Sequence, residues 1–161
     1  MVERRRRGVR TALVGEALRV ALAARERTDP GAGLDIVDLG GGTGGFAVPL
    51  AVEGHRVTVV DPSPDALASL ERRARDEGVS ELVRGVQGDA AELLGLVGES
   101  SADAVLCHGV LEVVDDPDAA LSSLAAVLRP GGTLSLLVSQ RHAAVVARAM
   151  AGSRYNRAAQ S

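Results

Sequence analysis

Apolar residues along the chain form short continuous runs that alternate with longer stretches of helical period. The short runs, bounded by Gly, Pro, Asp or Ser, predict five β-strands, at residues 34–39, 55–60, 81–87, 102–107 and 132–139. The longer stretches predict helices at residues 9–27, 46–53, 64–77, 90–96, 117–128 and 141–150. Because strand and helix alternate with short connections, the strands should be parallel and joined by right-handed crossovers.

The helix expected at residues 64–77 has the clearest boundaries. Pro62 and Pro64 flank Ser63, and proline is tolerated in a first turn where Ser63 can cap the free N–H groups. Gly78 is expected to end the helix, since glycine readily adopts the backbone conformation that follows a last turn.

The pattern as a whole predicts an α/β fold, a Rossmann-like doubly wound parallel sheet. We expect residues 1–27 to form an N-terminal helix that contributes to a ligand site at the strand ends. Residues 28–152 should form the Rossmann-like core that binds the ligand, and residues 153–161 a polar tail without clear period.

Composition narrows the class of protein without identifying its chemistry. The 161 residues are 46% hydrophobic and carry a net charge of −3, so the chain is not built as a general polyanion binder. The run from Arg4 to Arg7 is interpreted as a solvated terminus, with a nucleic-acid or phosphate contact as the alternative. Cys107 is the single cysteine and is expected to be a small buried residue rather than a nucleophile. We expect a cytoplasmic protein without a membrane span or a metal site.

A glycine-rich loop after the first strand is the strongest local motif. Gly40, Gly42 and Gly45 satisfy the dinucleotide pattern G-x-G-x-x-G. Asp38, with Gly40, Gly42 and Gly44, satisfies the acidic-x-G-x-G-x-G pattern of S-adenosylmethionine binding. Glycines allow the tight turn and the close approach of a ligand to the backbone, but this loop alone does not choose between the two cofactors.

Two further aspartates follow the next two strands. Asp61 can accept hydrogen bonds from both hydroxyls of an adenosine ribose, which the two cofactors share. The alternative is a capping role before Pro62. Asp89 can receive the adenine amino group, and a helix N-cap is a competing role that does not exclude the first.

The turn before the fifth strand favours the methionine cofactor. Residues 128–132 read Leu-Arg-Pro-Gly-Gly, a helix-turn-strand signature that is common in methyltransferase cores and unusual in dehydrogenases. We therefore predict S-adenosyl-L-methionine binding, with a nicotinamide cofactor as the rival hypothesis.

These residues resemble the class I S-adenosylmethionine-dependent methyltransferases over roughly residues 9–152. Within that superfamily, residues 107–117, Cys-His-Gly-Val-Leu-Glu-Val-Val-Asp-Asp-Pro, are similar to the bacterial tRNA 5-carboxymethoxyuridine methyltransferases. So are residues 127–136, the glycines after Asp38, and Gly54-His55 before the second strand. The resemblance implies methylation, and tRNA modification as its purpose.

The resemblance also implies a role for individual residues in cofactor binding. Arg10 matches an N-terminal arginine whose guanidinium can grip the methionine carboxylate. Gly40 and Gly41 match the glycines that touch the methionine part, and Gly42 belongs to the same loop. Asp61 matches the ribose acid, and His108 matches a cofactor-contacting histidine. The adenine segment falls on Asp89, Ala90 and Ala91.

His108 has two competing interpretations, a structural residue at a strand end and, less favoured, a general base. No catalytic residue is assigned, because methyl transfer to an acceptor that is already anionic, such as the carboxylate of 5-carboxymethoxyuridine, needs no base. A small carboxylate or hydroxyl remains an alternative acceptor, and a cofactor-binding module without turnover is an alternative function. The scarcity of aromatics, 1% of the chain, weakens a tRNA contact based on stacking.

The chain departs from the family at both ends. Relatives carry a segment before the position of Arg10 and continue beyond position 161. We therefore expect a C-terminally truncated chain, in which the usual sixth and seventh strands are missing. The fifth strand should then be an exposed edge with Leu134, Leu136 and Val138, which favours self-association. Such a chain should bind cofactor but methylate poorly. Its oligomeric state is left open.

Overall fold

The computed structural model describes the backbone of residues 2–26, 30–140 and 143–147, and the side chains of residues 11–26 and 30–138. The chain divides into two compact units, Met1–Ala32 and Gly33–Ser161, which are considered separately. The first unit contains one helix, α1 (Val2–Glu26), which begins earlier than the helix expected from residue 9. The tail at residues 153–161 lies outside the described residues.

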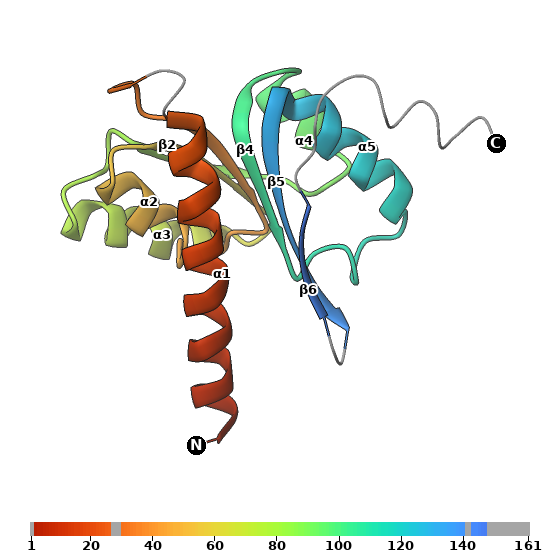
Figure 1. The fold of residues 1–161 in the computed structure, drawn as a ribbon, viewed down its shortest axis with the longest axis horizontal. Coiled ribbons are helices and arrows are strands. Elements are labelled where there is room, and N and C mark those ends of the chain that lie inside the picture. The colour runs from red at the N-terminus through yellow and green to blue at the C-terminus, as the bar shows by residue number, and fades with distance from the viewer. Residues whose placement is uncertain (1, 27–29, 141–142, 148–161) are drawn as a thin grey trace. The chain divides into compact units, whose positions relative to one another are not determined.

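The second unit is a sheet with helices on both faces. Its strands are β1 (Asp35–Leu39), β2 (Arg56–Asp61), β3 (Val83–Gln87), β4 (Ala102–His108), β5 (Leu128–Gln140) and β6 (Ala143–Ala147). The helices are α2 (Ala47–Val52), α3 (Pro64–Asp76), α4 (Leu93–Val97) and α5 (Pro117–Val127). Figure 1 shows α2 and α3 on one face of the sheet and α4 and α5 on the other.

The strand order is β3-β2-β1-β4-β5-β6, and β1 to β5 are all parallel. This is the doubly wound Rossmann-like order, so the predicted fold class is confirmed. The central strands are buried on both faces, which explains their continuous apolar sequences. β1 and β4 lie side by side, yet the chain leaves them toward opposite edges of the sheet. A crevice forms at such a switch point, outside the carboxyl ends of the strands.

Helix α3 shows how closely local sequence determined the element boundaries. Ser63 is its N-cap and its hydroxyl accepts a hydrogen bond from Ala66 N–H at 3.2 Å, while Pro64 occupies the first turn. Gly78 follows the C-cap with a φ of +71°, in the left-handed region that favours glycine. Both boundary predictions are confirmed.

The helix predicted at residues 141–150 is wrong for residues 143–147, the part of it that the structure describes. Residues 143–147 form β6, which pairs antiparallel with β5, so the fifth strand is not the exposed edge that was expected. The described sheet thus has a sixth strand, antiparallel to β5, in addition to the five parallel strands that were predicted. The alanines at residues 143–148 favour a helix. The free backbone N–H and C=O groups along β5, however, can form strand-to-strand hydrogen bonds with the segment that follows, and this favours a strand.

Four charged side chains join the amino ends of neighbouring strands. Asp35 on β1 accepts from Arg56 Nε at 2.6 Å and from Arg129 Nη1 at 2.9 Å. Arg129 also contacts Asp103 on β4 at 2.9 Å, and that same carboxylate accepts the Asp35 N–H. Burial alone would raise the pKa of Asp35, but the hydrogen bonds from Arg56 and Arg129 outweigh it and lower the pKa. Arg129, from the Leu-Arg-Pro-Gly-Gly segment, therefore ties β5 to β1 and β4.

We expect Arg129→Ala to lower the free energy of unfolding by about 1–2 kcal/mol at pH 7, because it removes two partly buried ion pairs together. The contribution of Asp35 is present above the pKa of an unfolded aspartate and is lost as the pH falls through its lowered folded pKa. Urea unfolding at pH 7 and pH 3 measures both effects. An equal difference between wild type and Arg129→Ala at the two pH values would contradict the ion-pair explanation.

Candidate cofactor site

The glycine loop passes over a buried carboxylate at the end of β1. Asp38 is 3% exposed, and its Oδ2 has no hydrogen-bond partner among the described residues. A Cβ at Gly41 would collide with this oxygen, so only glycine lets the loop lie so close to it. Burial, and then the negative charge of Asp61, raise the pKa of Asp38 to about 7. The loop therefore rests on a carboxyl that changes charge near neutral pH.

Asp61, at the end of β2, connects the glycine loop to the start of α3. One carboxylate oxygen accepts from Gly42 N–H at 3.0 Å, and the other accepts from Ser63 N–H at 2.9 Å. The alternative role of Asp61 as a helix cap before Pro62 is wrong, because Ser63 is the N-cap of α3 and Asp61 accepts the Ser63 N–H instead. Each carboxylate oxygen can accept a second hydrogen bond, so Asp61 keeps free acceptor capacity. Its side chain is 8% exposed and still lines a pocket.

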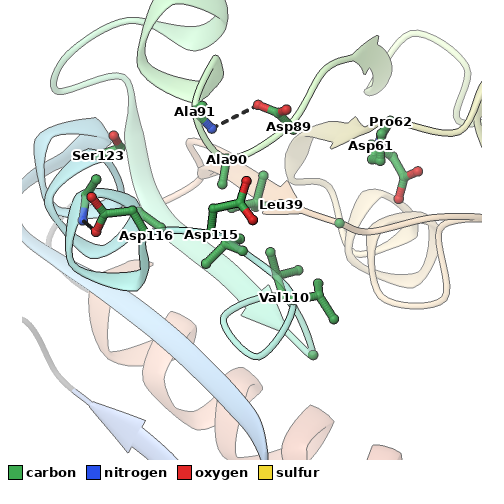
Figure 2. A pocket seen from close by; sticks show the side chains of 16 residues that line it. Leu39, Asp61, Pro62, Asp89, Ala90, Ala91, Val110, Asp115, Asp116 and Ser123 are labelled. Carbon is green, nitrogen blue, oxygen red and sulfur yellow. Dashed lines mark hydrogen bonds between the residues drawn. The ribbon is translucent and has the colours of Figure 1, made fainter.

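This pocket, of about 650 Å³, opens beside the carboxyl ends of β1 and β2 (Figure 2). It brings together five of the predicted cofactor residues from segments far apart in the sequence: Gly40, Asp61, Asp89, Ala90 and Ala91. The remainder of its wall comes from residues that the sequence analysis did not assign to a site: Leu39, Pro62, Gly109, Val110, Val113, Val114, Asp115, Asp116, Ala119, Ala120 and Ser123. Its lining is apolar with carboxylates, which suits a neutral aromatic ring with hydrogen-bond donors.

The residues that sequence reasoning missed lie mainly after β4 and on α5. Residues 109–114 belong to the segment that carried the family resemblance, so their position after a strand end was available as a signal. Ala119, Ala120 and Ser123 gave no signal, because only the packing of α5 beside α4 brings them to the pocket.

Asp89 serves the local backbone as well as the pocket. Its Oδ1 accepts from Ala91 N–H at 2.9 Å and from Glu92 N–H at 3.2 Å. Glu92 in return accepts the Asp89 N–H at 3.1 Å, a reciprocal arrangement typical of helix starts. Asp89 therefore caps the turn at residues 90–92, whereas the N-cap of α4 itself is Glu92, so the helix N-cap role foreseen for Asp89 is wrong. A role toward adenine stays a prediction.

His108 ends β4 next to the crevice but does not line the pocket. Its Nε2 lies 2.8 Å from Ser135 Oγ, and its ring meets that of Phe46 edge-on at 4.9 Å. Its Nδ1 is buried without a partner among the described residues. Burial lowers the pKa of His108 to about 4, so the imidazole is neutral at pH 7 and a weak base. These contacts support the structural interpretation, and contact with the cofactor stays a prediction.

The remaining candidates divide between the loop and the other unit. Gly41 and Gly42 lie in the loop beside the pocket rather than in its lining. Arg10 lies on α1, and its side chain is outside the described residues, so its role stays a prediction.

Cys107 is fully buried, and burial is the main cause that raises the pKa of its thiol to about 11. This confirms that it is a packing residue. No described helix has the length and apolar character to cross a membrane.

Comparison with known proteins gives the family. The family described as "Methyltransferase domain" matches residues 37–136. The tRNA 5-carboxymethoxyuridine methyltransferase of Escherichia coli (strain K12) is 35% identical over 120 residues, which cover 74% of this chain and 46% of that protein. The ubiquinone biosynthesis O-methyltransferase of Xanthomonas axonopodis pv. citri is 35% identical over 131 residues, 80% of this chain and 52% of that protein.

A solved structure extends the likeness to three dimensions. The S-adenosylmethionine-dependent methyltransferase of Thiobacillus denitrificans, crystallised with S-adenosyl-L-homocysteine, has a TM-score of 0.59 and 30% identity, over 77% of this chain and 45% of that one. The chain spans about half the length of the curated relatives it matches. Since the family match covers more than half of the chain and the sheet has the corresponding strand order, the chain belongs to the class I S-adenosylmethionine-dependent methyltransferases.

Proposed function

We propose that this chain binds S-adenosyl-L-methionine and forms the cofactor-binding core of a methyltransferase. The observation that carries the proposal is the pocket at the switch point, which joins the glycine loop, Asp61 and the 89–91 segment. The pattern found in the sequence and the pocket found in the structure coincide at these residues.

The residues present fit the adenosine half of this cofactor. Asp61 accepts the Gly42 N–H of the loop with one oxygen and the Ser63 N–H with the other, and each oxygen keeps a lone pair for a ribose hydroxyl. Leu39, Ala90 and Val110 offer apolar surfaces on which an adenine ring can pack. Asp38, whose buried Oδ2 has no described partner, is an acceptor directly beneath the loop expected to hold the methionine part.

When bound, the cofactor supplies an activated methyl group on a sulfonium, whose leaving group is a neutral thioether. The chain then has to orient the reactants and exclude water, and no acid is needed. His108 is neutral with a pKa of about 4 and is held by Ser135, so it is poorly suited to deprotonate a hydroxyl. This supports an acceptor that is already anionic.

For the acceptor we infer the carboxylate of wobble 5-carboxymethoxyuridine in tRNA. The similarity to the Escherichia coli enzyme and the weak basicity of His108 support it. A small-molecule hydroxyl is the second candidate, favoured by the similarity to the ubiquinone biosynthesis O-methyltransferase. A small carboxylate would suit the same chemistry.

Cofactor binding is tested by titrating the chain with S-adenosylhomocysteine and with NADH in a calorimeter. We expect S-adenosylhomocysteine to bind and NADH not to bind, because Asp38, Asp89 and the 128–132 segment match the methyltransferase pattern. Tight NADH binding without any response to S-adenosylhomocysteine would overturn the proposal in favour of an oxidoreductase.

The acceptor is tested under single-turnover conditions, with the chain in excess over tRNA from a strain lacking the endogenous enzyme. Labelled S-adenosylmethionine is the donor, and the excess of chain makes slow transfer measurable. We expect label in tRNA that mild alkali releases, since a methyl ester hydrolyses and a methyl ether does not. Alkali-stable label on a phenolic acceptor would favour the second candidate. Cofactor binding without methyl transfer to tRNA or to a phenolic acceptor would indicate a cofactor-binding module without turnover.

A further inference from the structure

Four consecutive arginines, Arg4 to Arg7, form a basic segment that has no part in the proposed cofactor site. Helix α1 begins at Val2, so the structure places the whole basic segment within a regular helix. Successive positions of an α-helix are offset by about 100° around its axis. The four arginine positions therefore surround one turn of α1, and the positive charge of the segment is concentrated there.

Helix stability does not account for this charge. Basic residues in the first turns of a helix oppose its macrodipole, which favours acidic residues at that end. Like charges three or four positions apart repel each other, and Arg4 and Arg7, as well as Arg6 and Arg10, have these spacings. Glu3 is the single acid in the sequence of residues 2–10. The basic segment therefore destabilises the helix, and an anionic partner offsets this effect.

The described part of the second unit offers little positive charge to a polyanion. Arg56 and Arg129 are already paired with aspartates, and α3 carries three arginines together with three acids. The pocket lining contains no basic residue and four aspartates, Asp61, Asp89, Asp115 and Asp116. A nucleic acid that approaches the pocket meets these carboxylates, so its phosphates need a basic contact elsewhere on the chain.

We propose that the basic segment binds the phosphate backbone of the tRNA acceptor. This inference rests on the proposed function, in which tRNA receives the methyl group. Guanidinium groups form charge-assisted hydrogen bonds with phosphate oxygens, and their binding releases counterions that are condensed on the nucleic acid. The contact needs no stacking on bases, which agrees with an aromatic content of only 1%. It holds the tRNA without reading its sequence.

The distribution of charge along α1 favours a nucleic acid over an anionic membrane. A helix that lies on a membrane carries an apolar face opposite a basic face along its length. In α1 the basic segment surrounds one early turn, whereas the exposed large apolar side chains, Leu13 and Val20, belong to later turns. Charge and exposed apolar surface are thus separated along the axis of the helix rather than across it.

The test measures the binding of fluorescently labelled tRNA to the whole chain by anisotropy at several salt concentrations. The triple variant Arg4→Gln, Arg5→Gln, Arg6→Gln leaves Arg10 unchanged. We expect its affinity at about 0.1 M salt to fall roughly 100-fold. The slope of log K against log salt concentration should become shallower by about 2–3, because fewer counterions are released. The same three arginines replaced by lysine should retain affinity within about threefold, since the charge is kept.

The matched control removes the same charge from exposed positions of the second unit, through Arg72→Gln, Arg75→Gln and Arg84→Gln. It should keep the wild-type salt dependence of tRNA binding. The triple glutamine variant in α1 should also keep the wild-type affinity for S-adenosylhomocysteine and should not unfold at a lower temperature, because repulsion within the helix is relieved. These two readouts separate lost tRNA contact from damage to the fold or to the cofactor site.

Unchanged tRNA affinity and salt dependence in the triple glutamine variant overturn the inference. So does a variant that binds tRNA as wild type does but no longer binds vesicles of phosphatidylserine and phosphatidylcholine, because the basic segment then serves a membrane. A wild-type chain that binds S-adenosylhomocysteine but no tRNA contradicts the tRNA acceptor and this inference together. A wild-type chain that binds tRNA but not S-adenosylhomocysteine contradicts the proposed cofactor binding alone.

Discussion

Replacing Asp61 with alanine is expected to weaken S-adenosylhomocysteine binding by roughly 100-fold. Two hydrogen bonds from the ribose hydroxyls to a charged acceptor are lost, at about 1.5 kcal/mol or more each. The structure adds a second cause, because the same carboxylate fixes Gly42 N–H at 3.0 Å and so shapes the glycine loop. Isothermal titration with S-adenosylhomocysteine measures the change.

Asp61→Asn separates the two causes. The asparagine oxygen can still accept one backbone N–H, but its NH2 group can no longer accept from the second hydroxyl. We therefore expect an intermediate loss of affinity. Asp65→Ala, an exposed aspartate in the first turn of α3, is the control and should bind as wild type does. A loss under threefold in Asp61→Ala would mean that this residue only holds the backbone N–H groups of Gly42 and Ser63.

Replacing Asp38 with asparagine is expected to raise the free energy of unfolding of the ligand-free chain by up to about 4 kcal/mol at pH 8. Folding raises the pKa of this carboxyl from 3.8 to about 7, mainly through burial and then through the charge of Asp61. The folded chain thus holds a proton between these values that the unfolded chain has lost. Stability falls as the pH rises through this window and levels off above pH 7, by an amount set by the pKa difference.

Urea unfolding from pH 4 to pH 8 tests this sign. The wild-type curve should slope downward between pH 4 and pH 7 relative to that of Asp38→Asn, and the two proteins should have similar stability near pH 4. Taking the difference between the two proteins removes the contribution of the titrating groups that do not interact with Asp38. A difference that is constant across this range would show that Asp38 does not carry the raised pKa.

The order and type of most elements could be read from the sequence because local and global preferences agree there. Apolar runs that end at Asp38 and Asp61 can be buried only as strands of a parallel sheet, and Ser63 and Gly78 mark the ends of α3 by their own backbone chemistry. The glycines after one strand and the acid after the next form a local signature of a cofactor that contains adenosine, and the turn at residues 128–132 favoured S-adenosylmethionine over a nicotinamide cofactor.

Residues 143–147 show where local preference failed. Alanine-rich sequence favours a helix, but the decision between helix and strand depended on an edge of the sheet that only the assembled fold provides. The local sequence pattern of residues 143–147 carries no information about the free edge of β5.

The sequence by itself determined the Rossmann-like architecture and the line of residues from Gly40 through Asp61 to Asp89, because each follows a strand and parallel strands end at one edge of a sheet. The tertiary structure decided what each group does there. Packing of α5 beside α4 built the far wall of the pocket, and backbone N–H groups engaged Asp89. Burial beneath Gly41, rather than residue type, moved the pKa of Asp38. These outcomes depend on desolvation and on partners distant in the chain, which no local sequence pattern encodes.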